Sequence, residues 1–194
     1  MYMTKKKILV FLGHPDKETL SGHFADEYER GAKEAGHEVR RTNLADMSFD
    51  PILHKGYKSI QELEPDLKKL QEDVKWCDHF VILYPAWWST MPAMLKGMFD
   101  RVWLPGFAFR FPHHGLMWTP LFKGKTSHVF VTSDTSPWIS RFIFGDTTNE
   151  IKKGILWFAG FRVRVKKVGP IKHITPERVK HFSHMFYRYG KKAR

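Results

Sequence analysis

The stretch His79-Phe80-Val81-Ile82-Leu83-Tyr84, which is apolar from Phe80 onward, is the strongest strand signal in the chain. A continuous run of this length is typical of a strand buried on both faces, as in a parallel sheet that helices cover on either side. Outward from it, a helical pattern of leucines precedes the run, and a loop bounded by Pro85 and Pro92 follows it and leads into a second helical pattern. The run therefore predicts the centre of a layered α/β sheet.

Strands and helical patterns alternate along the rest of the chain. Four further strands are predicted at Lys7–Leu12, His37–Leu44, Ser127–Thr132 and Arg162–Val168. Helices are predicted at Leu20–Ala35, Ile60–Trp76, Met91–Trp103, Thr148–Ala159 and Pro176–Tyr189, with a mostly irregular segment at Pro105–Thr126. This alternation predicts an α/β fold with a five-stranded parallel sheet in the flavodoxin-like order 2-1-3-4-5 and helices on both faces.

Length and composition restrict the class of protein. The chain has 194 residues, of which 42% are hydrophobic and 15% aromatic, which excludes a disordered chain and suits a single domain over residues 1–194. The longest apolar runs have five residues, far fewer than the ~20 that a membrane-spanning helix needs. No apolar segment of signal-peptide length follows Lys5–Lys7, and Cys77 is the only cysteine. A cytoplasmic protein without a membrane span is therefore expected.

Positive charge is concentrated near the C-terminus. The formal net charge is +12, and residues 161–194 hold eleven Lys and Arg against one acidic residue, Glu177. Such a segment fits a solvated face, a site for an anionic cofactor, or a nucleic-acid surface. The sequence has no zinc-finger spacing, RNP-like aromatic signature or basic leucine zipper, so no nucleic-acid partner is expected. The readings of a solvated face and of an anionic-cofactor site stay open, and an RNA-binding protein that acts through this segment is kept as a competing alternative.

Ligands of such sheets bind beyond the carboxyl ends of the strands, so the loops after Leu12, Tyr84 and Thr132 are the places to search. The first loop has hydroxyl groups at Thr19 and Ser21, where a helix begins. A helix N-terminus with hydroxyl donors can hold a phosphate, although Ser and Thr are also ordinary N-caps. The loop lacks the glycine patterns of nucleotide triphosphatases and dinucleotide-binding folds.

The second and third loops complete a possible binding site. Trp87 and Trp88 follow the buried strand, and they either form a wall for a planar ring or divide between the core and a subunit contact. The third loop, Thr132–Pro137, is rich in small polar residues, so it either offers backbone N–H donors or is an ordinary polar turn. A phosphate seat, an aromatic wall and hydrogen-bond donors at one sheet edge together suit an isoalloxazine ring with a phosphorylated tail.

At these loops the chain resembles the NAD(P)H:quinone oxidoreductase family of flavodoxin-like flavoproteins, which includes the modulator-of-drug-activity proteins and the ancillary flavoproteins of potassium efflux systems. His14 with Thr19–Ser21 resembles the first flavin loop of the family. The most specific stretch, Pro85–Arg101, resembles the family segment in which a proline and aromatic residues face the flavin and a helix continues through Leu-Lys-Gly. Gly145-Asp146 and Gly154–Phe161 also match family segments.

The resemblance implies a flavin that takes a hydride at N5 from NAD(P)H and passes electrons to a quinone or similar acceptor by ping-pong kinetics. Together with the three loops, it predicts cofactor contacts at His14, Thr19, Leu20, Ser21, Pro85, Ala86, Trp87, Trp88, Ser89, Thr132, Ser133, Asp134 and Thr135. Backbone N–H groups of the Thr132–Thr135 turn are expected to stabilise negative charge on the reduced ring. No side chain is expected to act as a catalytic acid or base.

The sequence departs from better-known family members at three places. Ser133-Asp134 replaces a glycine pair of the third loop. Trp138 and Phe144 lie where the quinone reductases place a tyrosine and a histidine that assist hydride transfer, so they are expected to contact the substrate without relaying charge. The chain ends at Arg194 without the extension of the longer FAD-binding members, which favours FMN over FAD.

The resemblance also implies partners and alternatives. A homodimer is expected, in which each subunit helps to form the pocket of the other, with acceptor contacts in the segment Phe107–Thr119. A nitro-, azo- or flavin reductase on the same scaffold is the main alternative, and a flavin-carrying regulatory subunit of a transporter is another. No metal is expected, because His113 and His114 have no Cys, Asp or Glu at ligand spacing.

Overall fold

The chain forms one parallel sheet between two layers of helices. The structure is a computed structural model that describes residues 4–112 and 117–193, so His113 and His114 lie outside the described residues. Five strands make up the main sheet in the order β2-β1-β3-β6-β7. Their bounds are Lys7–Leu12 (β1), Glu38–Asn43 (β2), His79–Pro85 (β3), Thr126–Thr132 (β6) and Arg162–Val168 (β7). Counted along the main strands alone, this is the order 2-1-3-4-5, so the fold prediction is confirmed.

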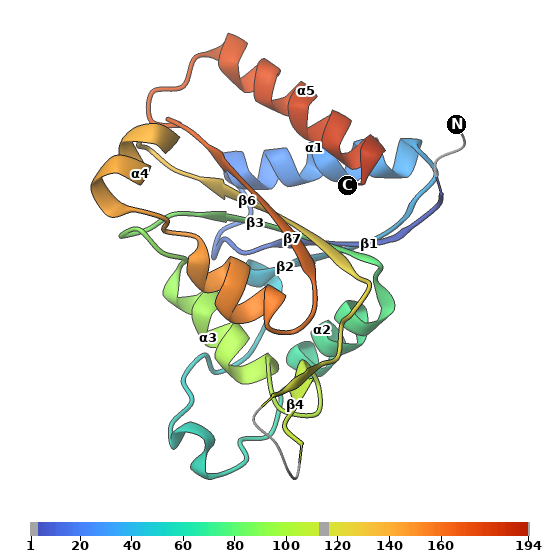
Figure 1. Ribbon diagram of the computed structural model, residues 1–194. Helices are drawn as coiled ribbons and strands as arrows, with labels where there is room; N and C mark the ends of the chain where they lie inside the picture. Colours follow the sequence, from blue (N-terminus) through green and yellow to red (C-terminus); the bar gives the residue numbers. More distant parts are fainter. Residues whose placement is uncertain (1–3, 113–116, 194) are drawn as a thin grey trace.

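Helices cover both faces of the sheet (Figure 1). On one face lie α1 (Leu20–Glu34) and α5 (Pro176–Lys192), and on the other lie α2 (Pro65–Trp76), α3 (Ala93–Val102) and the π-helix η3 (Glu150–Trp157). Because side chains alternate along a strand, β1 sends Leu9 and Phe11 into one core and Ile8 and Val10 into the other. This two-sided burial explains the continuous apolar runs of β1 and β3.

The helix predicted at Ile60–Trp76 begins five residues later, at Pro65. Proline disfavours helical backbone in the residue before it, so Glu64 is extended, and the side chain of Ile60 is 92% exposed. The extended segment is fixed by the buried guanidinium of Arg101, which donates to the Glu64 carboxylate at 2.8 Å and to the Glu62 carbonyl at 2.6 Å. The prediction for residues 60–64 was therefore wrong.

Several short elements lack a sequence signal. The helix α4 (Pro137–Phe144) was not predicted, because no residue of it is buried and it therefore has no core-facing stripe. The segment predicted to be mostly irregular contains a two-residue antiparallel pair, β4 (Phe109–Arg110) and β5 (Thr119–Pro120). Two 3₁₀ turns, η1 (Leu44–Asp46) and η2 (Gly56–Lys58), follow β2 and precede α2.

Two further observations concern the whole described chain. Cys77 is fully buried, and this burial raises the pKa of its thiol to about 12, so it is a packing residue. None of the described helices has the length and apolar character required to cross a bilayer.

Candidate functional site

The carboxyl ends of β1, β3, β6 and β7 are joined by backbone hydrogen bonds just beyond the strands. Gly13 donates to the Leu83 carbonyl at 2.7 Å, Ala86 donates to the Thr132 carbonyl at 2.7 Å, and Ser133 donates to the Val168 carbonyl at 3.0 Å. The loops 13–19, 86–92 and 133–136 therefore meet at one edge of the sheet, which we call the rim. The predicted convergence of these three loops is observed.

The first rim loop leads into the N-terminus of α1. Thr19 is the N-cap, and its Oγ1 accepts from the N–H of Gly22 at 3.3 Å. Among the described residues, the backbone N–H groups of Leu20 and Ser21 have no acceptor. These two donors and the positive end of the helix dipole provide the elements of an anion seat.

The hydroxyl of Ser21 has a partner inside the protein. Ser21 Oγ lies 3.0 Å from Thr132 Oγ1, and both side chains are buried, with Thr132 at 0% exposure. Neither hydroxyl is therefore presented to a ligand at the rim. What Ser21 offers there is its backbone N–H.

The second rim loop holds both tryptophans outside the core. Trp87 and Thr90 exchange two backbone hydrogen bonds, which closes a tight turn with Trp88 and Ser89 at its centre. Both central residues have left-handed φ angles, 49° and 64°. Trp87 is 44% and Trp88 99% exposed, so the alternative that one ring belongs to the core is wrong. Non-glycine residues in this conformation cost about 1–3 kcal/mol each and are concentrated at functional sites.

The first two loops touch through aromatic rings. The His14 ring lies edge-on to the Trp87 ring at 5.5 Å between centroids. His14 Nδ1 accepts from the N–H of Asp16 at 2.9 Å, and partial burial lowers the pKa of His14. These contacts favour a neutral His14 imidazole that packs against the Trp87 ring. Pro85 is buried at the end of β3, and Ala86 is half-buried beside it.

In the third rim loop, some of the polar groups form hydrogen bonds within the protein. Ser133 donates its N–H to Val168 and its hydroxyl to the Thr135 carbonyl at 2.7 Å. In the described part of the chain, the N–H groups of Asp134 and Thr135 have no acceptor. Of the predicted donors of this turn, these two are the ones left for a ligand.

Trp138 and Phe144, the predicted substrate contacts, stand at the two ends of α4. Their side chains are 72% and 56% exposed. The helix begins directly after the third rim loop, so Trp138 lies near the rim. Neither residue carries a titratable group, as the sequence already shows.

Sequence reasoning missed one polar contact of the rim. Thr90 donates its hydroxyl to the Glu150 carboxylate at 2.5 Å. This hydrogen bond connects the turn Trp87–Thr90, which we call the tryptophan turn, to η3. No local signal could have found this pair, because its residues are far apart in the chain. For the described residues, no group of three His, Cys, Asp or Glu side chains is placed to hold a metal ion.

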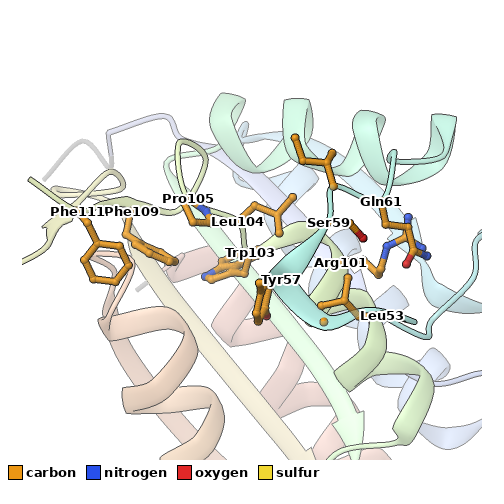
Figure 2. Close-up of a pocket in the computed structure, with 12 residues that line it drawn as sticks. Leu53, Tyr57, Ser59, Gln61, Arg101, Trp103, Leu104, Pro105, Phe109 and Phe111 are labelled. Carbon is orange, nitrogen blue, oxygen red and sulfur yellow. The ribbon is translucent and has the colours of Figure 1, made fainter. Parts of the chain in front are cut away.

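A cavity of about 690 Å³ lies away from the rim, between the C-terminus of α3, β4 and the segment before α2. Its lining residues are Leu53, Gly56, Tyr57, Ser59, Ile60, Gln61, Arg101, Trp103, Leu104, Pro105, Phe109 and Phe111. Figure 2 shows the rings of Tyr57, Trp103, Phe109 and Phe111 toward one end of the cavity, with Arg101 and Gln61 at the other end. No residue of the rim loops lines this cavity, whereas Phe109 and Phe111 belong to the segment expected to contact an acceptor.

Comparison with known protein families shows which family this chain belongs to. A family described by its flavodoxin-like fold matches residues 6–174. The chain belongs to this family. The resemblance expected from the rim loops is confirmed by relatives that are named as NAD(P)H oxidoreductases and quinone reductases.

Two curated relatives illustrate the similarity of this flavodoxin-like chain. A protein of Escherichia coli that is named as an uncharacterized NAD(P)H oxidoreductase is 29% identical over 131 residues, covering 63% of this chain and 67% of the relative. The human ribosyldihydronicotinamide dehydrogenase [quinone] is 25% identical over 201 residues, covering 90% of this chain and 86% of the relative. The expectation of an enzyme of the NAD(P)H dehydrogenase type is in line with both names.

Solved structures agree on the fold. A protein of Streptococcus mutans is 25% identical, with a TM-score of 0.81, covering 95% of this chain and 98% of the other. An FMN-dependent NADH-azoreductase from Bacillus anthracis, solved in complex with FMN, shares the flavodoxin-like fold with a TM-score of 0.69 at 16% identity. That match covers 96% of this chain and 98% of the azoreductase.

Proposed function

We propose that the protein is a flavin-dependent NAD(P)H oxidoreductase that reduces a quinone or a similar small acceptor. The observation that carries the proposal is the rim, where free backbone N–H donors from two loops flank two exposed tryptophans. A flavin held at the rim would supply the redox chemistry that links NAD(P)H to the acceptor.

The rim fits the chemical parts of a flavin. The N–H groups of Leu20 and Ser21 at the start of α1 suit the phosphate of the flavin tail, with Thr19 fixing the helix start. Trp87 and Trp88 supply flat apolar surface for the ring and exclude water from it. The free N–H groups of Asp134 and Thr135 suit the ring edge where negative charge gathers on reduction.

The residues of the rim orient and stabilise, and none is placed to move a proton. His14 is held neutral against Trp87, and Ser21 and Thr132 bond to each other. Trp138 and Phe144 offer apolar contacts to the substrate. Rate acceleration then comes from holding the donor and the ring in contact and from fixed dipoles at the ring edge.

FMN is the proposed cofactor, with FAD as the alternative. The fold neighbour from Bacillus anthracis is named as FMN-dependent and was solved with FMN. The same neighbour favours azo-group reduction as a second candidate activity, because an azo substrate would be reduced at the same rim. We also propose a homodimer, in which the aromatic cavity near Phe109 and Phe111 forms a contact surface for the second subunit.

The test begins with the purified protein. A flavin absorbance spectrum, with FMN released on denaturation, and NADPH oxidation that depends on a quinone support the proposal. A preparation that takes up neither FMN nor FAD overturns it. A panel of quinones and azo compounds then separates the two candidate activities.

A matched pair of variants tests the rim directly. Trp88→Ala should raise the Kd for flavin about fivefold, since loss of a ring contact is worth about 1 kcal/mol. Trp157→Ala is the control, because Trp157 is also exposed, at 58%, but lies on η3. Equal affinity of both variants and the wild-type protein would contradict the assignment of the tryptophan turn.

A further inference from the structure

A second hollow lies beside the rim, between α4 and the edge strand β7. It has a volume of about 380 Å³, and its lining includes Trp138 and Arg141 of α4, Lys152 of η3 and Lys167 of β7. α4 starts directly after the third rim loop, and the last residue of β7, Val168, pairs with Thr132. Figure 1 shows α4 beside the end of the sheet where β6 terminates. The hollow is therefore a neighbour of the proposed flavin site.

Three cations of the described residues line this hollow, and none of them forms an ion pair. Arg141, Lys152 and Lys167 have no carboxylate within ion-pair distance in the described part of the chain. Lys167 Nζ donates to the neutral Thr147 hydroxyl at 2.8 Å. By contrast, cations on other helices, such as Arg30 on α1 and Lys96 on α3, are paired with carboxylates one helical turn away.

Among the described residues that line the hollow, Asp146 is the one acidic group, and its carboxylate is hydrogen-bonded within its own loop. Asp146 Oδ1 accepts from the hydroxyl of Thr148 at 2.6 Å and from its N–H at 3.1 Å. These hydrogen bonds, with the nearby charges of Lys167 and Lys152, lower the pKa of Asp146. The carboxylate therefore stays charged and offsets one of three positive charges, which leaves the hollow electropositive.

The hollow also has an aromatic wall. Trp138 is 72% exposed and lines it together with the cations. Aromatic rings stack with purine bases, and guanidinium and ammonium groups bind phosphate. A ligand with a flat base and phosphate groups fits this lining, because the base can stack on Trp138 and the phosphates can bind the cations.

We propose that this hollow binds the phosphorylated adenosine end of NADPH, with adenine against Trp138 and phosphate between Arg141, Lys152 and Lys167. The proposal rests on the proposed oxidoreductase function, because the nicotinamide end then reaches the neighbouring rim. The net positive charge of this lining favours NADPH over NADH, since the 2′-phosphate adds negative charge. FAD also carries a phosphorylated adenosine, so the experiment distinguishes the two sources.

The first measurement is calorimetric titration of the purified protein with adenosine 2′,5′-bisphosphate. The double variant R141Q/K152Q should raise its Kd about tenfold. The control K153Q/K180Q removes the same charge from two exposed lysines that do not line the hollow, and it should stay within about twofold of wild type. Absence of binding to the wild-type protein, or an equal loss in both double variants, overturns the proposal.

The second measurement separates the donor from the cofactor. In R141Q/K152Q the KM for NADPH should rise about tenfold, while the KM for ribosyldihydronicotinamide, which has no phosphate, stays within about twofold. A weaker affinity for FAD with an unchanged affinity for the bisphosphate would assign the hollow to the cofactor tail and overturn the proposal. If the protein takes up no flavin, the proposed function fails, whereas the bisphosphate titration still decides whether this site exists.

Discussion

Ser21 Oγ lies 3.0 Å from Thr132 Oγ1, in a buried contact between the first turn of α1 and the last residue of β6. This bond joins the first and third rim loops below the surface that they present. It holds the free N–H groups of Leu20 and Ser21 in a fixed position relative to those of Asp134 and Thr135. The two sets of donors that the proposed cofactor needs are thus positioned by one hydroxyl pair.

Ser21→Ala should lower the free energy of unfolding by about 1–3 kcal/mol, because the buried Thr132 hydroxyl loses its partner. Urea denaturation measures the change. Adding Thr132→Val should recover part of the loss, since both polar groups are then gone. Strictly additive effects of the two substitutions would show that the hydroxyls do not interact.

The backbone strain in the tryptophan turn is expected to lower the stability of the fold while it holds the tryptophans in position to bind flavin. Trp88→Asn with Ser89→Gly places residues that favour left-handed backbone at the two strained positions. The free energy of unfolding should increase by about 1–2 kcal/mol, and the melting temperature should rise with it. The affinity for flavin should fall. A variant that is less stable than the wild-type protein would refute the strain at this turn.

Arg101→Ala should lower the free energy of unfolding by about 3–5 kcal/mol. The substitution leaves the Glu64 carboxylate and the carbonyls of Glu62 and Asp50 without their shared donor. Arg110→Ala, at an exposed arginine on β4, is the control and should cost little. Similar denaturation midpoints for the two variants would argue against a structural role of Arg101.

His79 should make stability depend on pH. Burial lowers the pKa of His79 from its ordinary 6.5 to about 3, and the ring contacts Thr126 and Tyr28. The unfolded chain binds the proton more readily, so this contribution to stability is complete above about pH 6.5 and is lost as pH falls toward 3. The slope from His79 approaches about 1.4 kcal/mol per pH unit within this window.

Denaturation between pH 5 and pH 7 measures that slope in wild-type and His79→Gln protein. The variant should have a shallower slope, although burial also lowers the pKa of His14 and His37, so some dependence persists. An unchanged slope in His79→Gln would contradict the assignment.

Local sequence patterns were sufficient for the sheet. The apolar runs of β1 and β3 predicted their strands because both faces of a central parallel strand are buried, and this burial demands apolar residues at every position. Strand order followed from the alternation of strands and helices. The rim loops could also be predicted, since parallel strands place their carboxyl ends at one edge.

Local sequence patterns were insufficient for segments whose conformation depends on contacts with residues far away in the chain. α4 buries no side chain, so no periodic stripe marks it. The extended segment before Pro65 depends on Arg101, and the link between the tryptophan turn and η3 depends on Glu150. Each partner lies tens of residues away, and nothing in the neighbouring sequence specifies it.

The amino-acid sequence alone determined the layered fold, the three loops that meet, and the kind of ligand that their residues suit. Only the folded chain decided which groups at the rim are free. It joined the hydroxyls of Ser21 and Thr132, used the N–H of Ser133 in the sheet, and left those of Asp134 and Thr135 open. The reason is physical: a polar group becomes available or satisfied through neighbours that folding brings to it, and those neighbours come from distant strands.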